Sequence, residues 1–195
     1  SQQAQGPFRL RVLGNPGFEA TRFDFVSALA NEQAVKVWND VAGELQPCPL
    51  VDEVRARTGG LHGPVARPRR HHACPGERAV AVTLIEDQDY RARRCMLVDA
   101  PRGGSIVLEF QGVPSSRKLR GFAGFSYFNG RDGVGQQVEL TLAEAGRELG
   151  QHRAEAARGW VRFEVARPEP SSTVTLRVRR LADEPGDFCF ALEAR

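Results

Sequence analysis

Apolar and polar residues alternate along most of the chain after Glu77. In STVTLRVRR, for example, Val174, Leu176 and Val178 fall on one side and the residues between them are polar. This two-residue period is typical of a β-strand with one face buried and the other in solvent. The same alternation occurs in ERAVAVTLIE, SIVLEFQ, QQVELTLAE, WVRFEVA and DFCFALEA.

Turn residues separate these runs, and the stretches between them are too short for long helices. Seven or more short strands with polar outer faces predict an all-β chain, an antiparallel β-sandwich of jelly-roll type. Within the aromatic run GFAGFSYFN, Gly121 and Gly124 predict a bend or bulge in a strand.

The first part of the chain has a different pattern. RLRVL, near the start, alternates and predicts a first strand that the turn residues NPG end. In RFDFVSALANE, the residues Phe25, Val26 and Leu29 have helical spacing, which predicts one short helix or helical turn near the N-terminus. From 47 to 76 no period persists, and we expect one long, Arg-rich loop insertion there.

The composition is that of one globular domain. With 195 residues, 41% of them hydrophobic and 26% charged, the chain can bury a full core, and 1–195 is interpreted as a single domain. A net charge of +3 is far below the charge density of a dedicated nucleic-acid binder, so no nucleic-acid partner is expected. No run reaches the ~18 apolar residues of a membrane span. The polar start SQQAQGP looks like a stub left by processing, so a membrane tether through a removed segment stays open.

Four cysteines at wide spacings favour disulfides over a metal site. They are Cys48, Cys74, Cys95 and Cys189, and no C-x-x-C occurs among them. Of the three possible pairings we favour Cys48–Cys74, which would close the long loop, and Cys95–Cys189, which would join a middle strand to the last one. Two disulfides predict an oxidising, extracytoplasmic compartment, hence a periplasmic or secreted protein. The alternative is four reduced thiols in a cytosolic protein.

The segment NPGFE (15–19) resembles the opening of many carbohydrate-binding modules with a jelly-roll, galactose-binding-like fold. The order of runs in the second half of the chain is similar to that of such modules. The resemblance implies a non-catalytic binding module for a glycan or another polyanionic or hydroxylated ligand of the cell envelope. In those families the last strand often carries an acidic calcium ligand, whereas here it reads FCFALEA, so we expect no cofactor.

Exposed aromatic rings with polar neighbours are the chemistry that sugar recognition commonly uses. Trp160 is out of phase with the apolar residues of its strand, so we expect it to face away from the core or to cap it. Arginines of the long loop could also hold an acidic group through paired hydrogen bonds. The predicted ligand-binding residues are Trp38, Tyr127, Asn129, Arg131, Trp160, Arg69 and Arg70.

No G-x-S-x-G, H-E-x-x-H or phosphate-binding loop occurs in the sequence, and we expect no enzyme. The histidines of HHAC (71–74) are interpreted as solvated loop residues, and NGRDGVG (129–135) as a loop between strands, so no metal ligands are predicted. The expected partner is a glycan or an envelope protein, and the oligomeric state is left open. Two alternatives remain: a structural or accessory extracytoplasmic domain of an envelope or membrane-associated assembly, and a jelly-roll lyase that uses Tyr127 with Arg131.

Overall fold

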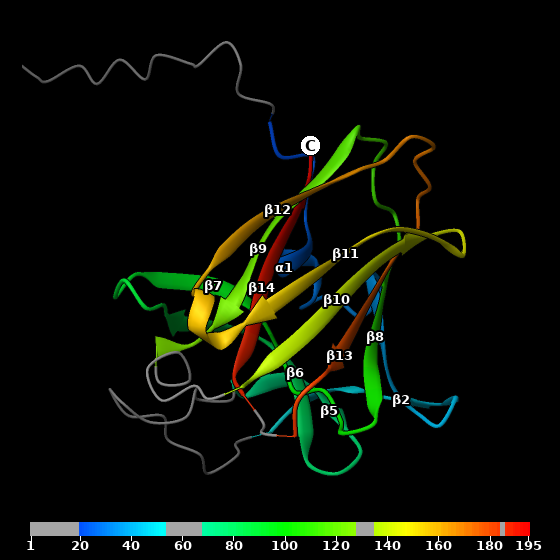
Figure 1. Cartoon of the computed structure of the whole chain (residues 1–195). Helices are drawn as coiled ribbons and strands as arrows, with labels where there is room; N and C mark the ends of the chain where they lie inside the picture. The colour runs from blue at the N-terminus through cyan, green and yellow to red at the C-terminus, as the bar shows by residue number, and fades with distance from the viewer. Residues whose placement is uncertain (1–19, 54–67, 128–134, 184–185) are drawn as a thin grey trace, which may run out of the picture.

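The chain folds into two antiparallel β-sheets packed face to face (Figure 1). The computed structural model describes residues 20–53, 68–127, 135–183 and 186–195. The all-β sandwich that the alternating pattern predicts is confirmed. The described residues contain the helix α1 (Phe25–Ala28) and the 3-10 turn η1 (Ala156–Arg158). No helix in these parts of the chain has the length and apolarity needed to cross a bilayer.

The first sheet has eight strands. Apart from β1, which pairs with β14, they lie in the order β12-β9-β14-β7-β6-β5-β4. Their bounds are β1 (Phe23–Asp24), β4 (Leu50–Asp52), β5 (Arg70–Cys74), β6 (Arg78–Glu86), β7 (Ala92–Val98), β9 (Lys118–Phe125), β12 (Val161–Ala166) and β14 (Phe188–Ala194).

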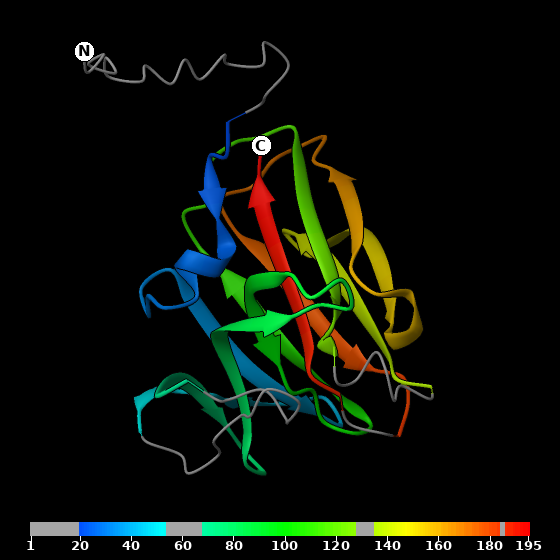
Figure 2. The same cartoon turned by 90° about the vertical axis from the view of Figure 1, so that its left-hand side faces the viewer.

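The second sheet has six strands in the order β11-β10-β13-β8-β2-β3. Figure 2 shows α1 beside β14, and α1 contacts both β14 and β7 of the first sheet. The bounds of the second sheet are β2 (Val35–Val41), β3 (Glu44–Pro47), β8 (Gly104–Phe110), β10 (Gln137–Glu144), β11 (Arg147–Glu155) and β13 (Val174–Arg180).

The core lies between the two sheets and follows the predicted alternation. In β13 of the second sheet, Val174, Leu176 and Val178 are fully buried. In β14 of the first sheet, Phe188 and Phe190 are buried in the same cluster. Because alternate side chains of the central strands enter this cluster, the hydrophobic pattern fixes which face of each sheet points inward.

The helix predicted near the N-terminus is the single turn α1. It begins after Asp24, whose carboxylate accepts a hydrogen bond from the backbone N–H of Val26 at 2.9 Å. Phe25, Val26 and Leu29 are all buried, in agreement with their helical spacing. The predicted strand RLRVL and the segment NPGFE lie outside the described residues.

The prediction of one long loop over 47–76 is wrong for its described parts. Within it, β4 and β5 pair with each other, and β5 continues the first sheet against β6. The pattern gave no strand signal because the buried side chains of β5 are His71, His72 and Cys74 rather than aliphatic residues. Residues 54–67 lie outside the described residues.

Gly121 and Gly124 mark no bulge, which corrects that part of the prediction of a bend or bulge. β9 pairs with both β12 and β14 without a shift of register. A Cβ on Gly121 would lie 2.4 Å from the ring of Phe163, and one on Gly124 would lie 2.8 Å from the carbonyl oxygen of Gly159. Glycine is needed at these positions because neighbouring groups approach the β9 backbone closely.

Two disulfides join Cys48 to Cys74 and Cys95 to Cys189. These are the pairs that the sequence favoured. The first connects the end of β5 to the residue after β3, and the second connects β7 to β14 in the middle of the first sheet.

Candidate functional site

Three aromatic side chains from separate parts of the chain gather at one end of the first sheet. Tyr90 lies in the turn between β6 and β7, Tyr127 follows β9, and Trp160 precedes β12. Since β9 and β12 are antiparallel neighbours, the end of one lies beside the start of the other. The side chain of Gln88 donates a hydrogen bond from the β6–β7 turn to a carbonyl of η1, which holds the turn at the same end. We call Tyr90, Tyr127, Trp160 and Arg93 the aromatic surface.

A buried carboxylate organises the β6–β7 turn. The side chain of Asp87 is 3% exposed and accepts hydrogen bonds from the backbone N–H groups of Asp89 and Arg91, each at 2.9 Å. It also accepts a hydrogen bond from Nε of Arg93 at 2.7 Å. Burial alone would raise the pKa of Asp87, but the hydrogen bonds from Arg91, Arg93 and Asp89 outweigh it and hold the pKa below its ordinary value of 3.8.

The most exposed part of the aromatic surface is a pair of tyrosines. Tyr90 is 63% exposed, and its ring centroid lies 4.8 Å from that of Tyr127 at an interplanar angle of 37°. The hydroxyl of Tyr90 donates to the hydroxyl of Tyr127 at 2.9 Å. Tyr90 has a φ of 58°, in the left-handed region that bulky residues rarely adopt. The turn therefore holds a large ring in solvent at a backbone position where a smaller residue would be favoured.

Trp160 forms the inner part of the aromatic surface. It packs against a small cluster on the outer face of the first sheet that contains the Cys95–Cys189 disulfide. Its Nε1 donates a hydrogen bond to the carbonyl oxygen of Phe125 at 3.2 Å. The guanidinium of Arg93 lies 5.8 Å from the centre of the indole ring, within the range of a cation–π contact. Trp160 therefore faces away from the main core, as its phase predicts, and is held from two sides.

The other predicted tryptophan lies elsewhere. Trp38 is on the outer face of the second sheet, where it lies between Val107 of β8 and Pro47 of β3. Its neighbours Val37 and Asn39 in β2 are buried and face inward. The two tryptophans therefore lie on opposite outer faces of the sandwich.

The predicted polar residues are not part of the described aromatic surface. Arg69 pairs with Asp52, and both side chains are mostly exposed. Arg70 opens β5, which lies toward the opposite edge of the first sheet from β12. Asn129 and Arg131 lie outside the described residues.

Sequence reasoning missed Tyr90. The residue stands in the charged stretch EDQDYRARR, where no alternation marks a buried or a paired position. The one available signal is the aromatic residue itself, because a large ring in a polar turn has no core to enter. The sequence does not show that this ring meets Tyr127, because the two are separated by 37 residues.

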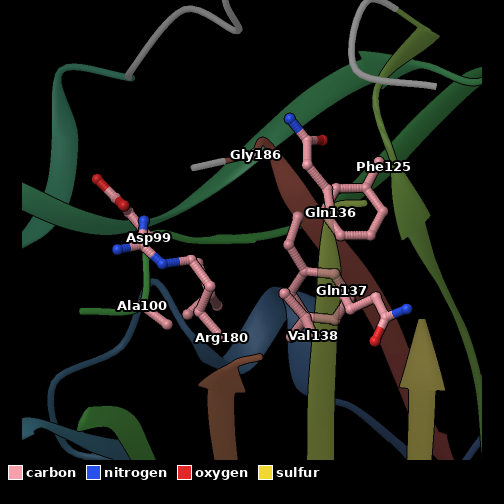
Figure 3. A pocket seen from close by; sticks show the side chains of 10 residues that line it. Asp99, Ala100, Phe125, Gln136, Gln137, Val138, Arg180 and Gly186 are labelled. Atoms are coloured by element: carbon pink, nitrogen blue, oxygen red, sulfur yellow. The ribbon is translucent and has the colours of Figure 1, made fainter. Parts of the chain in front are cut away.

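Close to this end, between the sheets, there is a small pocket (Figure 3). Asp99 and Arg180 lie on one side of it, and Phe125 and Gln136 on the other. The space that the centre of a water molecule can reach is about 10 Å³, which is enough for about one water. This pocket is therefore too small for a sugar ring.

The histidines of HHAC are not solvated, which corrects that prediction. His71 is 1% exposed and His72 is 3% exposed. The two ring nitrogens of His72 each lie 3.1 Å from a backbone carbonyl oxygen, one of Cys48 and the other of Leu29. Both ring nitrogens of His72 are thus used in contacts with the backbone. Within the described ranges, no three His, Cys, Asp or Glu side chains are placed to hold a metal ion.

No protein-family model matches the chain, and no curated protein matches it either. Among solved structures, the chain is similar to the structure of a family 51 carbohydrate-binding module with an INT domain from Clostridium perfringens ZmpB, at 11% identity and a TM-score of 0.43. That match covers 59% of this chain and 26% of the other. A second ZmpB structure, of the M60 catalytic domain with two such modules, matches at 12% identity and a TM-score of 0.42, over 83% of this chain and 17% of that one.

A family 61 carbohydrate-binding module in complex with β-1,4-galactotriose is similar at 11% identity and a TM-score of 0.33. The match covers 58% of this chain and 78% of the module. The likeness in all three concerns the fold alone. At that level the chain is similar to carbohydrate-binding modules.

Proposed function

We propose that this chain is a non-catalytic, extracytoplasmic module that binds a glycan at the aromatic surface. The observation that carries the proposal is the tilted ring pair Tyr90–Tyr127, which presents a ring that is 63% exposed at the same end of the first sheet as Trp160. Single exposed apolar residues are common on proteins, whereas two tyrosine rings brought together from separate segments at an exposed turn are not explained by the core.

The chemistry of the aromatic surface suits a sugar. The C–H face of a pyranose ring is apolar and packs against an aromatic face, while its hydroxyls need donors and acceptors in fixed positions. The paired hydroxyls of Tyr90 and Tyr127 supply both kinds of group at 2.9 Å from each other. The guanidinium of Arg93 adds donors and is oriented by Asp87. An open surface of this kind admits a sugar at the end or in the middle of a chain.

The titratable groups of the aromatic surface do not favour catalysis. Glycosidases use a pair of carboxyl groups, one of them protonated near neutral pH. Here the buried carboxylate is Asp87, whose three donors and lowered pKa keep it ionised and occupied. The two disulfides support a location in an oxidising compartment outside the cytoplasm.

A glycan array followed by calorimetry on the best-bound sugar tests the proposal. We expect Tyr90→Ala to weaken binding at least tenfold, which corresponds to about 1.4 kcal/mol. Phe122→Ala is the matched control, because Phe122 is another exposed aromatic residue of the first sheet and is 39% exposed. Its affinity should equal that of the wild type.

Two outcomes would count against the proposal. If Trp38→Ala abolishes binding and Tyr90→Ala does not change it, the site is on the second sheet. If no glycan binds to the folded protein, the structural or accessory role is favoured.

A further inference from the structure

A second candidate site lies at the other end of β9 and β12. A groove of about 520 Å³ opens there between the residues before β1, the β8–β9 connection, the β12–β13 connection and the end of β14. In Figure 1 this end lies at the top, beside the C-terminus. β9 has eight residues, so at about 3.4 Å per residue the groove is roughly 25 Å from the aromatic surface. We call it the arginine groove, after Arg22, Arg117, Arg167 and Arg195 in its lining.

A buried guanidinium forms the floor of the arginine groove. The side chain of Arg167 is 0% exposed and forms an ion pair with Glu144, whose side chain is 1% exposed. Its Nη1 donates to the carbonyl oxygen of Pro114 at 3.0 Å and to the hydroxyl of Ser116 at 2.6 Å, and its Nη2 donates to the carbonyl oxygen of Ser171 at 2.7 Å. These bonds fix the β8–β9 connection against the β12–β13 connection, so both walls of the groove are rigid.

Two arginines on the wall are held by their backbones while their side chains reach solvent. The N–H of Arg117 donates to the carbonyl oxygen of Arg195 at 3.1 Å, and its carbonyl oxygen accepts from the N–H of Arg167 at 2.8 Å. The N–H of Arg22 donates to the carbonyl oxygen of Ala194 at 2.8 Å, and its Nη1 donates to the carbonyl oxygen of Ser115 at 3.0 Å. Both side chains are exposed.

The arginine groove has an excess of positive charge. Arg167 is matched by Glu144, and Arg195 is matched by Glu193, at 2.7 Å. Arg22 and Arg117 form no ion pair with a side-chain carboxylate of the described residues. Two guanidinium groups without a side-chain carboxylate partner, at a concave site, attract an anion.

We propose that the arginine groove binds a sugar that carries a carboxylate, that is, a hexuronate residue of an acidic polysaccharide. A planar carboxylate matches the paired donors of a guanidinium. The rings of Pro168 and Pro170 in the lining offer an apolar wall to the sugar ring, and Ser115 offers polar groups to its hydroxyls. The volume of about 520 Å³ is in the range of small-ligand sites. The proposal does not depend on the aromatic surface, because the two sites share no residue.

Calorimetry with a galacturonic acid dimer, and with the neutral galactose dimer of the same linkage, tests this proposal. The acidic dimer should bind at least tenfold more tightly than the neutral one. Arg117→Gln and Arg22→Gln should each weaken the binding of the acidic dimer by a similar factor. A higher salt concentration should weaken this binding further. The matched control is Arg102→Gln, because Arg102 is an exposed arginine, paired with Asp183, that does not line the groove. Its affinity should not change.

Three results would overturn the proposal: no binding of the acidic dimer, equal affinity in Arg117→Gln, or equally effective displacement by inorganic sulfate, which would indicate a site for any small anion. Tyr90→Ala separates this proposal from the first one. The variant should leave the acidic dimer bound as in the wild type, and a loss of that binding would place the dimer on the aromatic surface instead.

Discussion

The two ends of the β9–β12 pair are organised by opposite charges. At the aromatic surface, the carboxylate of Asp87 accepts three hydrogen bonds. At the arginine groove, the guanidinium of Arg167 donates to four acceptors. Loops lack the regular backbone hydrogen bonds of a sheet. In each case one buried charged side chain forms hydrogen bonds with the loop groups instead.

The Asp87 and Arg167 clusters differ in the sequence separation of the residues that they connect and in how deeply those residues are buried. The donors to Asp87 come from residues two, four and six positions away, so Asp87 orders a single turn. The acceptors of Arg167 include groups 23, 51 and 53 positions away, so Arg167 connects separate segments. Arg93, the ionic partner of Asp87, is 31% exposed, whereas Glu144 is 1% exposed. Damage at Asp87 should therefore stay local, and damage at Arg167 should affect the whole domain.

The largest expected effect is that of Arg167→Met. Removal of the guanidinium leaves the Glu144 carboxylate buried without its counter-ion, and two carbonyl groups and a hydroxyl without their donor. We expect the free energy of unfolding to fall by about 3–5 kcal/mol. Urea unfolding followed by circular dichroism measures the change.

The double variant Arg167→Met/Glu144→Met is the matched control. It removes both charges, so it should be more stable than Arg167→Met alone. A loss below about 1 kcal/mol in the single variant would show that Arg167 does not hold the groove together, because such a loss is typical of an ordinary surface contact.

The next largest effect is expected from removing the Cys95–Cys189 disulfide, on which Trp160 packs. Replacing Cys95 and Cys189 by alanine removes a bridge between residues 94 positions apart, and we expect a loss of about 2–4 kcal/mol. Because Trp160 packs on this disulfide, its indole N–H resonance should also shift. The Cys48→Ala/Cys74→Ala variant should leave that resonance in place. An unchanged Trp160 signal in the first variant would mean that the disulfide does not position the ring.

The fold was predictable because its signal is local. The alternation in STVTLRVRR requires only that neighbouring residues face opposite sides, and Val174, Leu176 and Val178 are all buried. The phase of Trp160 likewise predicted its outward direction. β5 escaped prediction because its buried residues include His71 and His72. Backbone carbonyl groups lie within hydrogen-bond distance of Nδ1 of His71 and of both ring nitrogens of His72, and no periodicity reveals these contacts.

The candidate sites were less predictable because they depend on contacts between distant residues. Trp160 and Tyr127 were predicted, but Tyr90 became visible only through its stacking on Tyr127. Arg167 stands in ARPEPSS, which reads as an ordinary exposed loop. Its burial follows from Glu144, which a sequence pattern does not place beside it.

The smallest expected effect is that of Asp87→Asn, and it depends on pH. Near neutral pH, the variant should lose about 1 kcal/mol of unfolding free energy, since asparagine keeps the shape of aspartate but not its charge. The pKa of Asp87 is lowered in the folded protein, so its stabilising contribution is present above the ordinary pKa of 3.8 and is lost as the pH falls below it through the folded-state value. The gap between wild type and variant should therefore narrow at about pH 3. If the difference in unfolding free energy between wild type and variant is the same at both pH values, the charge of Asp87 does not order the turn. The difference between the Asp87 and Arg167 clusters would then be one of burial alone.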